Sequence, residues 1–385
     1  MDREISIGIP ERKTLSDLWA LSDKYYKIYG VEVENVSHWN PSEHFKDKLQ
    51  KEIKLPSLNP IVDYVVSTNF PESIDIIKKI GFNDKYQYGL VTPTGSVSIL
   101  STISFLKEQG VQKIVVLAPV YWTVIHICRQ FNIDIEIIYL ERHEGNFSVP
   151  KNITKKSRSE SEKIAYWFTN PVYCTGVHIN NELIKLSETL VNNNSWIIFD
   201  ECLSTISRSA GNQLRNYGKF IGIYAPHKGV CVNGIKFSIV ITDKYYKEFL
   251  EHWSTVHYGC LGASNRIAAL HFLSDDFDSY EKEFDSKISL TRDFLLDLSQ
   301  HHTGLSIDQS ANGYLNTLYF SNIKGDVSYD LDWLWNIVKE SGAIMIPGTR
   351  NHFSPNLEFC FRVNLSADSP RFRSRLINLV NILSG

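Results

Sequence analysis

The sequence lacks the cysteine spacings that hold zinc or build a disulfide framework. Its six cysteines are scattered, and no two of them form a Cys-x-x-Cys pair: Cys128, Cys174, Cys202, Cys231, Cys260 and Cys360. Structural zinc sites use closely spaced pairs of thiolates, and disulfide-rich scaffolds are short secreted chains. We therefore expect no metal site and no disulfides, and the scattered thiols suit the reducing cytoplasm.

Long apolar runs and an excess of charge of one sign are also absent. No window approaches the roughly 20 apolar residues that a membrane-spanning helix needs, and residues 1–6 are charged, without the apolar core of a signal peptide. The formal net charge of −3 provides no electrostatic reason to bind nucleic acid. Internal repeats and low-complexity linkers are missing too. We expect no membrane and no nucleic acid among the partners.

What the chain does have is a globular composition and a regular alternation of elements. It contains 385 residues, 43% of them hydrophobic and 22% charged, enough for one large domain or two of ordinary size. Short apolar runs predict strands over 113–117, 133–140, 163–168, 196–199, 220–224 and 237–242. Helical periodicity predicts helices over 70–80, 95–107, 123–130 and 180–191. This alternation is typical of an α/β fold, a three-layer αβα domain with a mainly parallel sheet.

The pattern changes after about residue 244. Helices are predicted over 245–253, 262–273, 280–301, 331–341 and from 371 onward, with strands over 313–321 and 358–365. This favours a smaller α+β domain at the C-terminal end. We expect three parts: an N-terminal arm and helix over 1–45, the large domain over 46–275 and the small domain over 276–385.

Within the first of these parts, residues 14–29 read as an amphipathic helix behind Thr14 as a cap. The aromatic, turn-rich segment 36–42 is consistent with an arm over a cleft, a subunit boundary or a packed surface loop. Trp39 and Trp122 are candidates for lining a pocket, although both also fit a hydrophobic core.

Lys228 lies in a tight, glycine-containing connection between two predicted strands, with Pro226 just before it. A lysine on such a turn can point into a cleft, where desolvation makes its amine nucleophilic. A solvated surface lysine is the simpler interpretation when the residue is taken alone.

Other noteworthy residues also lie where strands end or helices begin, and open α/β sheets bind ligands beyond the carboxyl ends of their strands. Gly95, Ser96 and Val97 open a helix, whose free N–H groups suit a phosphate. An ordinary cap by Thr94 or Ser96 explains the same residues. Tyr121 follows a predicted strand and is either a ring that stacks on a flat ligand or a core tyrosine.

Two charged residues complete the series. Asp200 follows an apolar strand and needs a partner, because an unpaired buried charge is costly. A protonated ring nitrogen, a neighbouring lysine or a backbone cap would each serve. Arg362 lies in a strand-like run, where it either clamps a carboxylate or forms a structural salt bridge.

In this order, the motifs resemble the fold-type I pyridoxal-phosphate enzymes, specifically the class I/II aminotransferase group, over residues 60–365. The resemblance implies that Lys228 binds pyridoxal 5'-phosphate as a Schiff base and then moves a proton. Asp200 would pair with the pyridine nitrogen, Tyr121 would stack on the ring, and the backbone of Ser96 and Val97, beside Gly95, would hold the phosphate.

The resemblance also assigns residues farther from the lysine. Asn170 and Tyr173 belong to the Asn-Pro loop that contacts the cofactor, and Lys236 takes the place of a phosphate-binding arginine. Tyr64 would reach the phosphate of the neighbouring subunit, and Arg362 would bind the α-carboxylate of an amino-acid substrate. The family is usually homodimeric, so the resemblance implies a homodimer.

The chain departs from the family pattern at three places. Tyr173 stands where the loop normally has an asparagine that donates to the ring oxygen of the cofactor, and Cys174 replaces its second proline. Leu203 replaces a tyrosine that contacts the same oxygen, and His227 precedes the lysine where a serine is usual nearby. His227 either titrates beside the Schiff base or simply packs. Lost donors change the pKa of the cofactor linkage.

Three functions are compatible with these residues. The first is a pyridoxal-phosphate aminotransferase of amino-acid metabolism. The second keeps the cofactor but performs elimination and cyclisation, or oxidation, on an arginine-like amino acid in specialised biosynthesis, as in capreomycidine synthase. The third, from another class, is a non-catalytic ligand-binding member of the fold.

Overall fold

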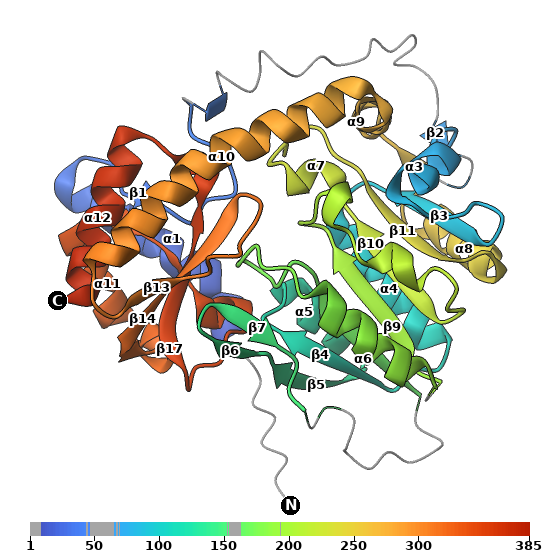
Figure 1. The fold of residues 1–385 in the computed structure, drawn as a ribbon, viewed down its shortest axis with the longest axis horizontal. Coiled ribbons are helices and arrows are strands. Elements are labelled where there is room, and N and C mark those ends of the chain that lie inside the picture. Colours follow the sequence, from blue (N-terminus) through green and yellow to red (C-terminus); the bar gives the residue numbers. More distant parts are fainter. Residues whose placement is uncertain are drawn as a thin grey trace, which may run out of the picture.

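The computed structural model describes residues 9–43, 45–46, 65–66, 68, 70–151, 153, 163–192 and 194–385. Tyr64 lies outside these residues. Figure 1 shows two sheets side by side, each with its own helices, and the long helix α10, Asp275–His301, runs past both.

The larger sheet has seven strands in the order β3-β11-β10-β9-β8-β4-β5. Its strands are β3 Gln87–Thr92, β4 Lys113–Ala118, β5 Asp134–Tyr139, β8 Ile164–Thr169, β9 Trp196–Glu201, β10 Phe220–Tyr224 and β11 Ser238–Asp243. All pairs are parallel except those of β11, which runs antiparallel to both β10 and β3. The predicted α/β class with a mainly parallel sheet is confirmed, but the sequence analysis did not predict β3.

Helices cover both faces of this sheet, as a three-layer fold requires. The core on one face includes side chains of α4 Gly95–Glu108, α5 Trp122–Gln130 and α8 Lys247–His257. The core on the other includes α3 Ser73–Ile80, α6 Asn180–Asn192 and α9 Ala263–Leu273. Strands β8 and β9 are buried along their whole length, which explains their nearly continuous apolar sequence.

The second sheet is antiparallel, with the order β13-β14-β17-β16. Its strands are β13 Leu305–Ile307, β14 Leu315–Lys324, β16 Ile346–Pro347 and β17 Glu358–Asn364. Around it lie α1 Ile9–Tyr29, α11 Leu331–Ser341 and α12 Pro370–Ser384. The α+β character of this part is therefore confirmed, whereas the domain boundaries near residues 45 and 275 stay predictions.

Six short strands form three pairs outside the two main sheets. β1 Glu34–Asn35 runs parallel to β15 Ala343–Ile344, which fixes the N-terminal segment to the second sheet's part of the fold. β2 Val65–Val66 pairs with β12 Cys260–Leu261, and β6 Glu141–His143 forms a hairpin with β7 Asn146–Ser148. Helix α1 begins at Ile9, so Thr14 lies inside it and the predicted cap at Thr14 is wrong.

Candidate active site

Lys228 lies on a single helical turn, α7 Pro226–Gly229, which connects β10 to β11. The turn is tightly packed: a Cβ on Gly229 would lie 2.6 Å from the backbone oxygen of Ser204. The lysine is half-buried, and its ammonium lies 5.1 Å from the centre of the Tyr121 ring and 4.9 Å from that of Trp39. It is therefore not the solvated surface lysine that the local sequence alone would favour.

A small cavity of about 20 Å³ opens beside this lysine. It is lined by Gly95, Ser96, Ile99, Tyr121, Thr169, Tyr173, Asp200, Cys202, Leu203 and Lys228. These residues come from five segments of the chain, spread over more than 130 positions of sequence. They meet at the carboxyl ends of the parallel strands, where open α/β sheets bind their ligands.

Asp200 places a carboxylate in the wall of this cavity. It is only 4% exposed, and Oδ1 accepts a hydrogen bond of 3.2 Å from the backbone N–H of Cys202. Burial raises the pKa of Asp200, while the Cys202 amide and the Lys228 amine act in the opposite direction. Two of the partners that the sequence suggested for Asp200, a backbone cap and a neighbouring lysine, are therefore present. Asp200 also lines the cavity, where a ligand can meet it.

Glu201, the next residue of β9, points to the other side of the sheet because side chains alternate along a strand. It is 1% exposed, and its carboxylate accepts four hydrogen bonds. The donors are Asn170 Nδ2 at 3.0 Å, Ser209 Oγ at 2.6 Å, Ala210 N at 2.8 Å and Gly211 N at 3.1 Å. The sequence analysis did not predict this buried hydrogen-bond network around Glu201.

Asn170, predicted to bind the cofactor, belongs to the hydrogen-bond network around Glu201. Its Nδ2 donates to Glu201 and, at 2.8 Å, to Asn180, and it is not among the residues that line the cavity. Its neighbour Thr169 does line the cavity, and the buried Thr169 hydroxyl has no hydrogen-bond partner among the described residues. The structure therefore supports an orienting role for Asn170 and adds Thr169 to the site.

The N-terminus of α4 forms another edge of the cavity. Thr94 caps this helix, since its side chain accepts from Val97 N at 3.3 Å, and its backbone oxygen accepts from the same amide at 3.0 Å. The ordinary cap considered from sequence is therefore present. Val97 is engaged within the turn, and Gly95 and Ser96 line the cavity. Gly95 packs tightly, because a Cβ there would approach the Cys202 sulfur to 3.2 Å.

Tyr121 and Tyr173 form an aromatic wall, with ring centres 5.7 Å apart. Tyr173 is 2% exposed, and burial raises the pKa of its hydroxyl well above the usual value. Its loop is held by Gly176, whose φ of +74° lies in the left-handed region. A Cβ on Gly176 would also collide with the backbone oxygens of Asn312 and Leu315.

Arg362, on β17 of the second sheet, comes close to the same site. It is 3% exposed, and Nε and Nη2 donate to the backbone oxygen of Ser37 at 3.1 and 3.0 Å. Its guanidinium carbon lies 4.1 Å from the centre of the Trp39 ring, and Nη1 lies 3.9 Å from the Cys174 sulfur. No ion pair of Arg362 occurs among the described residues, so the predicted structural salt bridge is absent there.

Two residues near the lysine lie elsewhere. His227 is fully buried and packs against Phe237 and Phe277, with Nε2 3.1 Å from Nδ1 of His271. Burial lowers the pKa of His227 to about 3, and the charge of His271 contributes in the same direction. Of the two alternatives considered from sequence, His227 therefore packs in the core. The Lys236 side chain is exposed and does not line the cavity.

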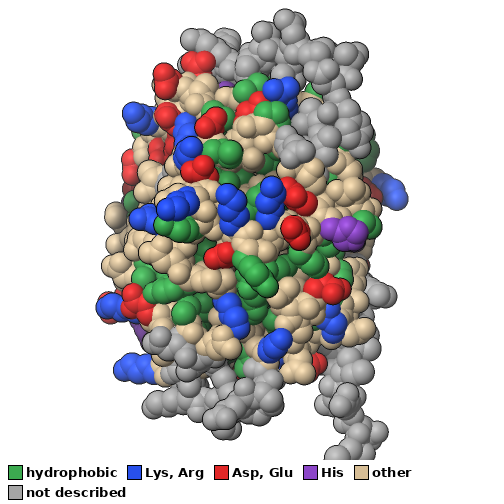
Figure 2. Space-filling view, turned by 90° about the vertical axis from the view of Figure 1, so that its right-hand side faces the viewer, with side chains coloured by type: hydrophobic (Ala, Val, Ile, Leu, Met, Phe, Trp, Pro, Cys, Tyr) green, Lys and Arg blue, Asp and Glu red, His purple; other side chains and the backbone are tan. Residues whose placement is uncertain are grey.

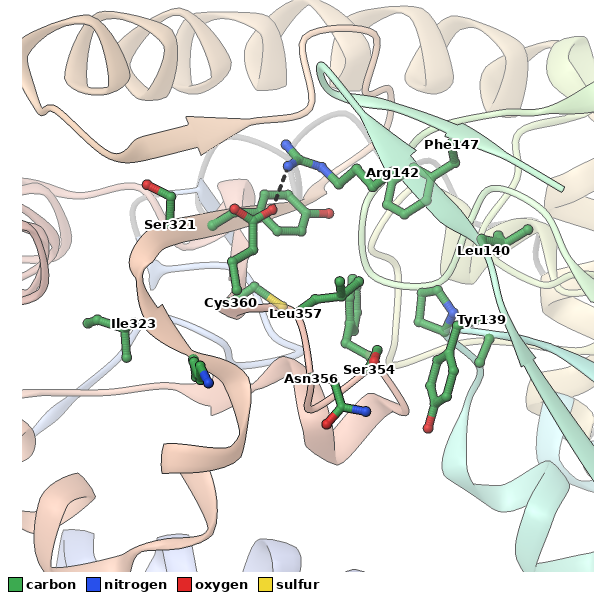
Figure 3. A pocket seen from close by; sticks show the side chains of 16 residues that line it. Tyr139, Leu140, Arg142, Phe147, Ser321, Ile323, Ser354, Asn356, Leu357 and Cys360 are labelled. Atoms are coloured by element: carbon green, nitrogen blue, oxygen red, sulfur yellow. Dashed lines mark hydrogen bonds and ion pairs between the residues drawn. The ribbon is translucent and has the colours of Figure 1, made fainter. Parts of the chain in front are cut away.

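A larger cavity of about 420 Å³ lies outside this site, between the β6–β7 hairpin and strands β14 and β17. Figure 3 shows Arg142 at its edge, paired with Glu358 at 2.8 Å. Arg142 also pairs with the buried Asp308 at 2.9 Å and lies over the Tyr319 ring. Because both carboxylates already engage Arg142, we interpret this network as a structural link between the β6–β7 hairpin and the second sheet.

The groups around Lys228 match the needs of pyridoxal phosphate. A lysine amine, a buried carboxylate, a flat aromatic ring and the open first turn of a helix converge on one cavity. The buried Thr169 hydroxyl supports this fit, because buried polar atoms usually have a partner and this one faces the cavity. Among the described residues, no group of three or more His, Cys, Asp or Glu side chains is arranged to hold a metal ion.

No protein-family model and no curated protein matches the sequence. Solved structures do match the fold. YbdL from Escherichia coli, identified as having a methionine aminotransferase function, is 14% identical, with a TM-score of 0.73 over 96% of this chain and 97% of that chain. A single mutant of the Thermus thermophilus aspartate aminotransferase is 15% identical, with a TM-score of 0.74 over 100% and 99%.

An aromatic aminotransferase from Pyrococcus horikoshii OT3 is 14% identical, with a TM-score of 0.70 over 94% of this chain and 98% of that chain. Similarity at this level establishes a common fold over nearly the full length. The chain therefore has the fold-type I architecture of the aminotransferases, as the order of its sequence motifs predicted.

Proposed function

We propose that this protein is a pyridoxal-phosphate enzyme that acts on an α-amino acid, with aminotransfer as its reaction. One observation carries the proposal: Lys228, Asp200 and Tyr121 line a single cavity, although they come from three separate segments of the chain. A structural role explains each residue alone, but it does not explain their convergence on an open space within a fold shared with aminotransferases.

The residues of the cavity would hold the cofactor by different chemistry. Lys228 Nζ would bind its aldehyde carbon, Tyr121 would stack on its ring, and the first amides of α4 would face its phosphate. When bound, the cofactor supplies an electron sink that stabilises negative charge on the substrate α-carbon.

The protein's own groups then bind and move protons. Asp200 is buried, so its carboxylate would keep a facing ring nitrogen protonated without competition from water. Arg362 would hold the substrate carboxylate through a charge-assisted pair. The free amine of Lys228 would take the proton from the substrate α-carbon and deliver it to the cofactor carbon. His227 is buried and has a low pKa, so it does not serve as the base.

Reduction of the linkage tests this proposal directly. Protein incubated with pyridoxal phosphate and then borohydride should carry one added pyridoxyl-phosphate group on the peptide that contains Lys228. Lys228→Arg should abolish the adduct, and Lys244→Ala, at an exposed lysine, should leave it unchanged. A protein that stays colourless and unlabelled would instead be a non-catalytic ligand-binding member of the fold.

A second reaction is favoured by one feature of the cavity. Leu203 lines it, so an apolar residue stands where the family pattern has a hydroxyl donor, and Tyr173 lines the same cavity. Fewer donors around the cofactor change the course of the reaction, which suits elimination with cyclisation, or oxidation, of an arginine-like amino acid. Formation of the pyridoxamine form and a keto acid would support aminotransfer; ammonia, peroxide or a cyclised product would support the second reaction.

We also propose that the protein is a homodimer in the cytoplasm, with a role in amino-acid metabolism or biosynthesis. Figure 2 views the side that carries α3, β3 and α8 in Figure 1, where hydrophobic side chains are exposed between charged ones. Ile74, Tyr245 and Val256 are exposed by 48%, 84% and 66%. Sedimentation equilibrium would test the dimer. No helix among the described residues is long and apolar enough to cross a membrane.

A further inference from the structure

The segment 36–42 crosses the site and is tied to both parts of the fold. On the side of the second sheet, the Asn364 amide donates to the backbone oxygens of His38 and Asn40 at 2.7 and 3.1 Å. On the side of the large sheet, Asn233 Nδ2 donates to the backbone oxygen of Trp39 at 2.9 Å. These bonds hold the backbone of Trp39 in place through Asn233, which is five residues after Lys228, and Asn364, which is two residues after Arg362.

The Trp39 ring lies between the two cationic groups of the site. Its centre is 4.9 Å from Lys228 Nζ and 4.1 Å from the guanidinium carbon of Arg362. The two cations are therefore no farther apart than the sum of these distances. A substrate whose amino group meets the lysine and whose carboxylate meets the arginine would therefore pass close to the indole ring.

The hydrogen bonds of Arg362 leave one edge of its guanidinium available. Ser37 takes the edge formed by Nε and Nη2, and the contact of Nη1 with the Cys174 sulfur is long. A guanidinium has five N–H donors, so one N–H on each of Nη1 and Nη2 remains. The guanidinium carbon lies 4.1 Å from the centre of the Trp39 ring, and no carboxylate among the described residues pairs with Arg362, so these two N–H groups can bind the carboxylate of a ligand.

We propose that Trp39 is a positioning and specificity-determining residue, which holds the Arg362 guanidinium for a carboxylate and forms the wall against which the substrate α-carbon lies. This inference rests on the proposed function. Arg362 is almost fully buried, so its cation–π contact with the indole is desolvated. Desolvated cation–π contacts are stronger than exposed ones. The indole also keeps water from the cation, which strengthens a carboxylate pair.

Carboxylate binding to the cofactor-free protein tests the proposal without any catalysis. The titrant is 4-methyl-2-oxopentanoate, and 4-methylpentan-2-one is the matched ligand without a carboxylate, both followed by calorimetry. Trp39→Ala should weaken binding of the oxo acid by about tenfold, and Trp39→Phe, which keeps a stacking ring, should stay within about threefold. Trp19→Ala removes an indole that is 43% exposed and should bind as the unmodified chain does.

Two results would overturn the role of Trp39: equal oxo-acid affinity in Trp39→Ala and the unmodified chain, or equal weakening in Trp39→Ala and Trp39→Phe. If Trp39→Ala loses stability as a whole, its thermal unfolding midpoint will be lower than that of the unmodified chain. In that case, the oxo-acid affinity of Trp39→Phe decides whether an aromatic ring is needed at this position. Failure of borohydride labelling at Lys228 would instead refute the proposed function, so the two failures are distinguishable.

Discussion

Glu201→Gln is the substitution that most directly tests how the active-site loops are held. The carboxylate of Glu201 accepts two donors on each oxygen: Asn170 Nδ2 and Ala210 N on Oε1, and Ser209 Oγ and Gly211 N on Oε2. Glutamine keeps the shape but offers only one acceptor oxygen. Its amide nitrogen must therefore face a pair of groups that are themselves donors.

The less costly orientation places the new NH₂ group at the former Oε2 position. The Ser209 hydroxyl can rotate and accept, but the Gly211 N–H loses its acceptor. One unpaired buried N–H costs about 1–3 kcal/mol. The three remaining hydrogen bonds also lose their charge assistance, which makes up about half the strength of such bonds. We expect a loss of about 3 kcal/mol in the free energy of unfolding.

Equilibrium urea unfolding at pH 7, followed by tryptophan fluorescence and circular dichroism together, measures this loss. The control is Glu188→Gln at an exposed position on α6, which should change stability by less than about 0.5 kcal/mol. A loss below about 1 kcal/mol for Glu201→Gln, or one equal to that of the control, would contradict the four-donor arrangement.

Two further substitutions probe backbone geometry and pH dependence. Gly176→Ala should cost more than about 3 kcal/mol, because its φ is positive and a Cβ would strike backbone oxygens of segment 312–315, whereas Gly218→Ala, with open space around it, should be nearly neutral. Equal urea midpoints for the two would refute this reading. His227 has a pKa of about 3 when folded, so only the unfolded chain takes up its proton below about pH 6.5 and stability falls as the pH falls. The stability difference between the unmodified chain and His227→Gln should therefore shift by about 2 kcal/mol against the unmodified chain from pH 7 to pH 5, and a constant difference would contradict the buried, neutral imidazole.

The local sequence was sufficient to predict most of the elements and the strand-end position of several site residues. Apolar runs bounded by turn residues marked β4, β8, β9 and β10, because a buried parallel strand needs apolar side chains on both faces. β3 was missed, because Gly89 and three polar or hydroxyl-bearing residues, Gln87, Tyr88 and Thr92, leave it only two purely apolar side chains. Its identity as a strand comes from pairing with β11, about 150 residues later in the chain.

For the site, the sequence determined which groups stand at the ends of strands: Lys228 after β10, Asp200 in β9 and Tyr121 after β4. Strand ends of a parallel sheet share one edge, so local pattern and topology together brought these residues to one cavity. Only the tertiary structure decided that Glu201 gathers four donors, that His227 meets His271, and that Trp39 lies between Lys228 and Arg362. The donors of Glu201 are 8 to 31 positions away from it, and the other two contacts join residues 44 to more than 300 positions apart. No local periodicity encodes which of these side chains will share a buried space.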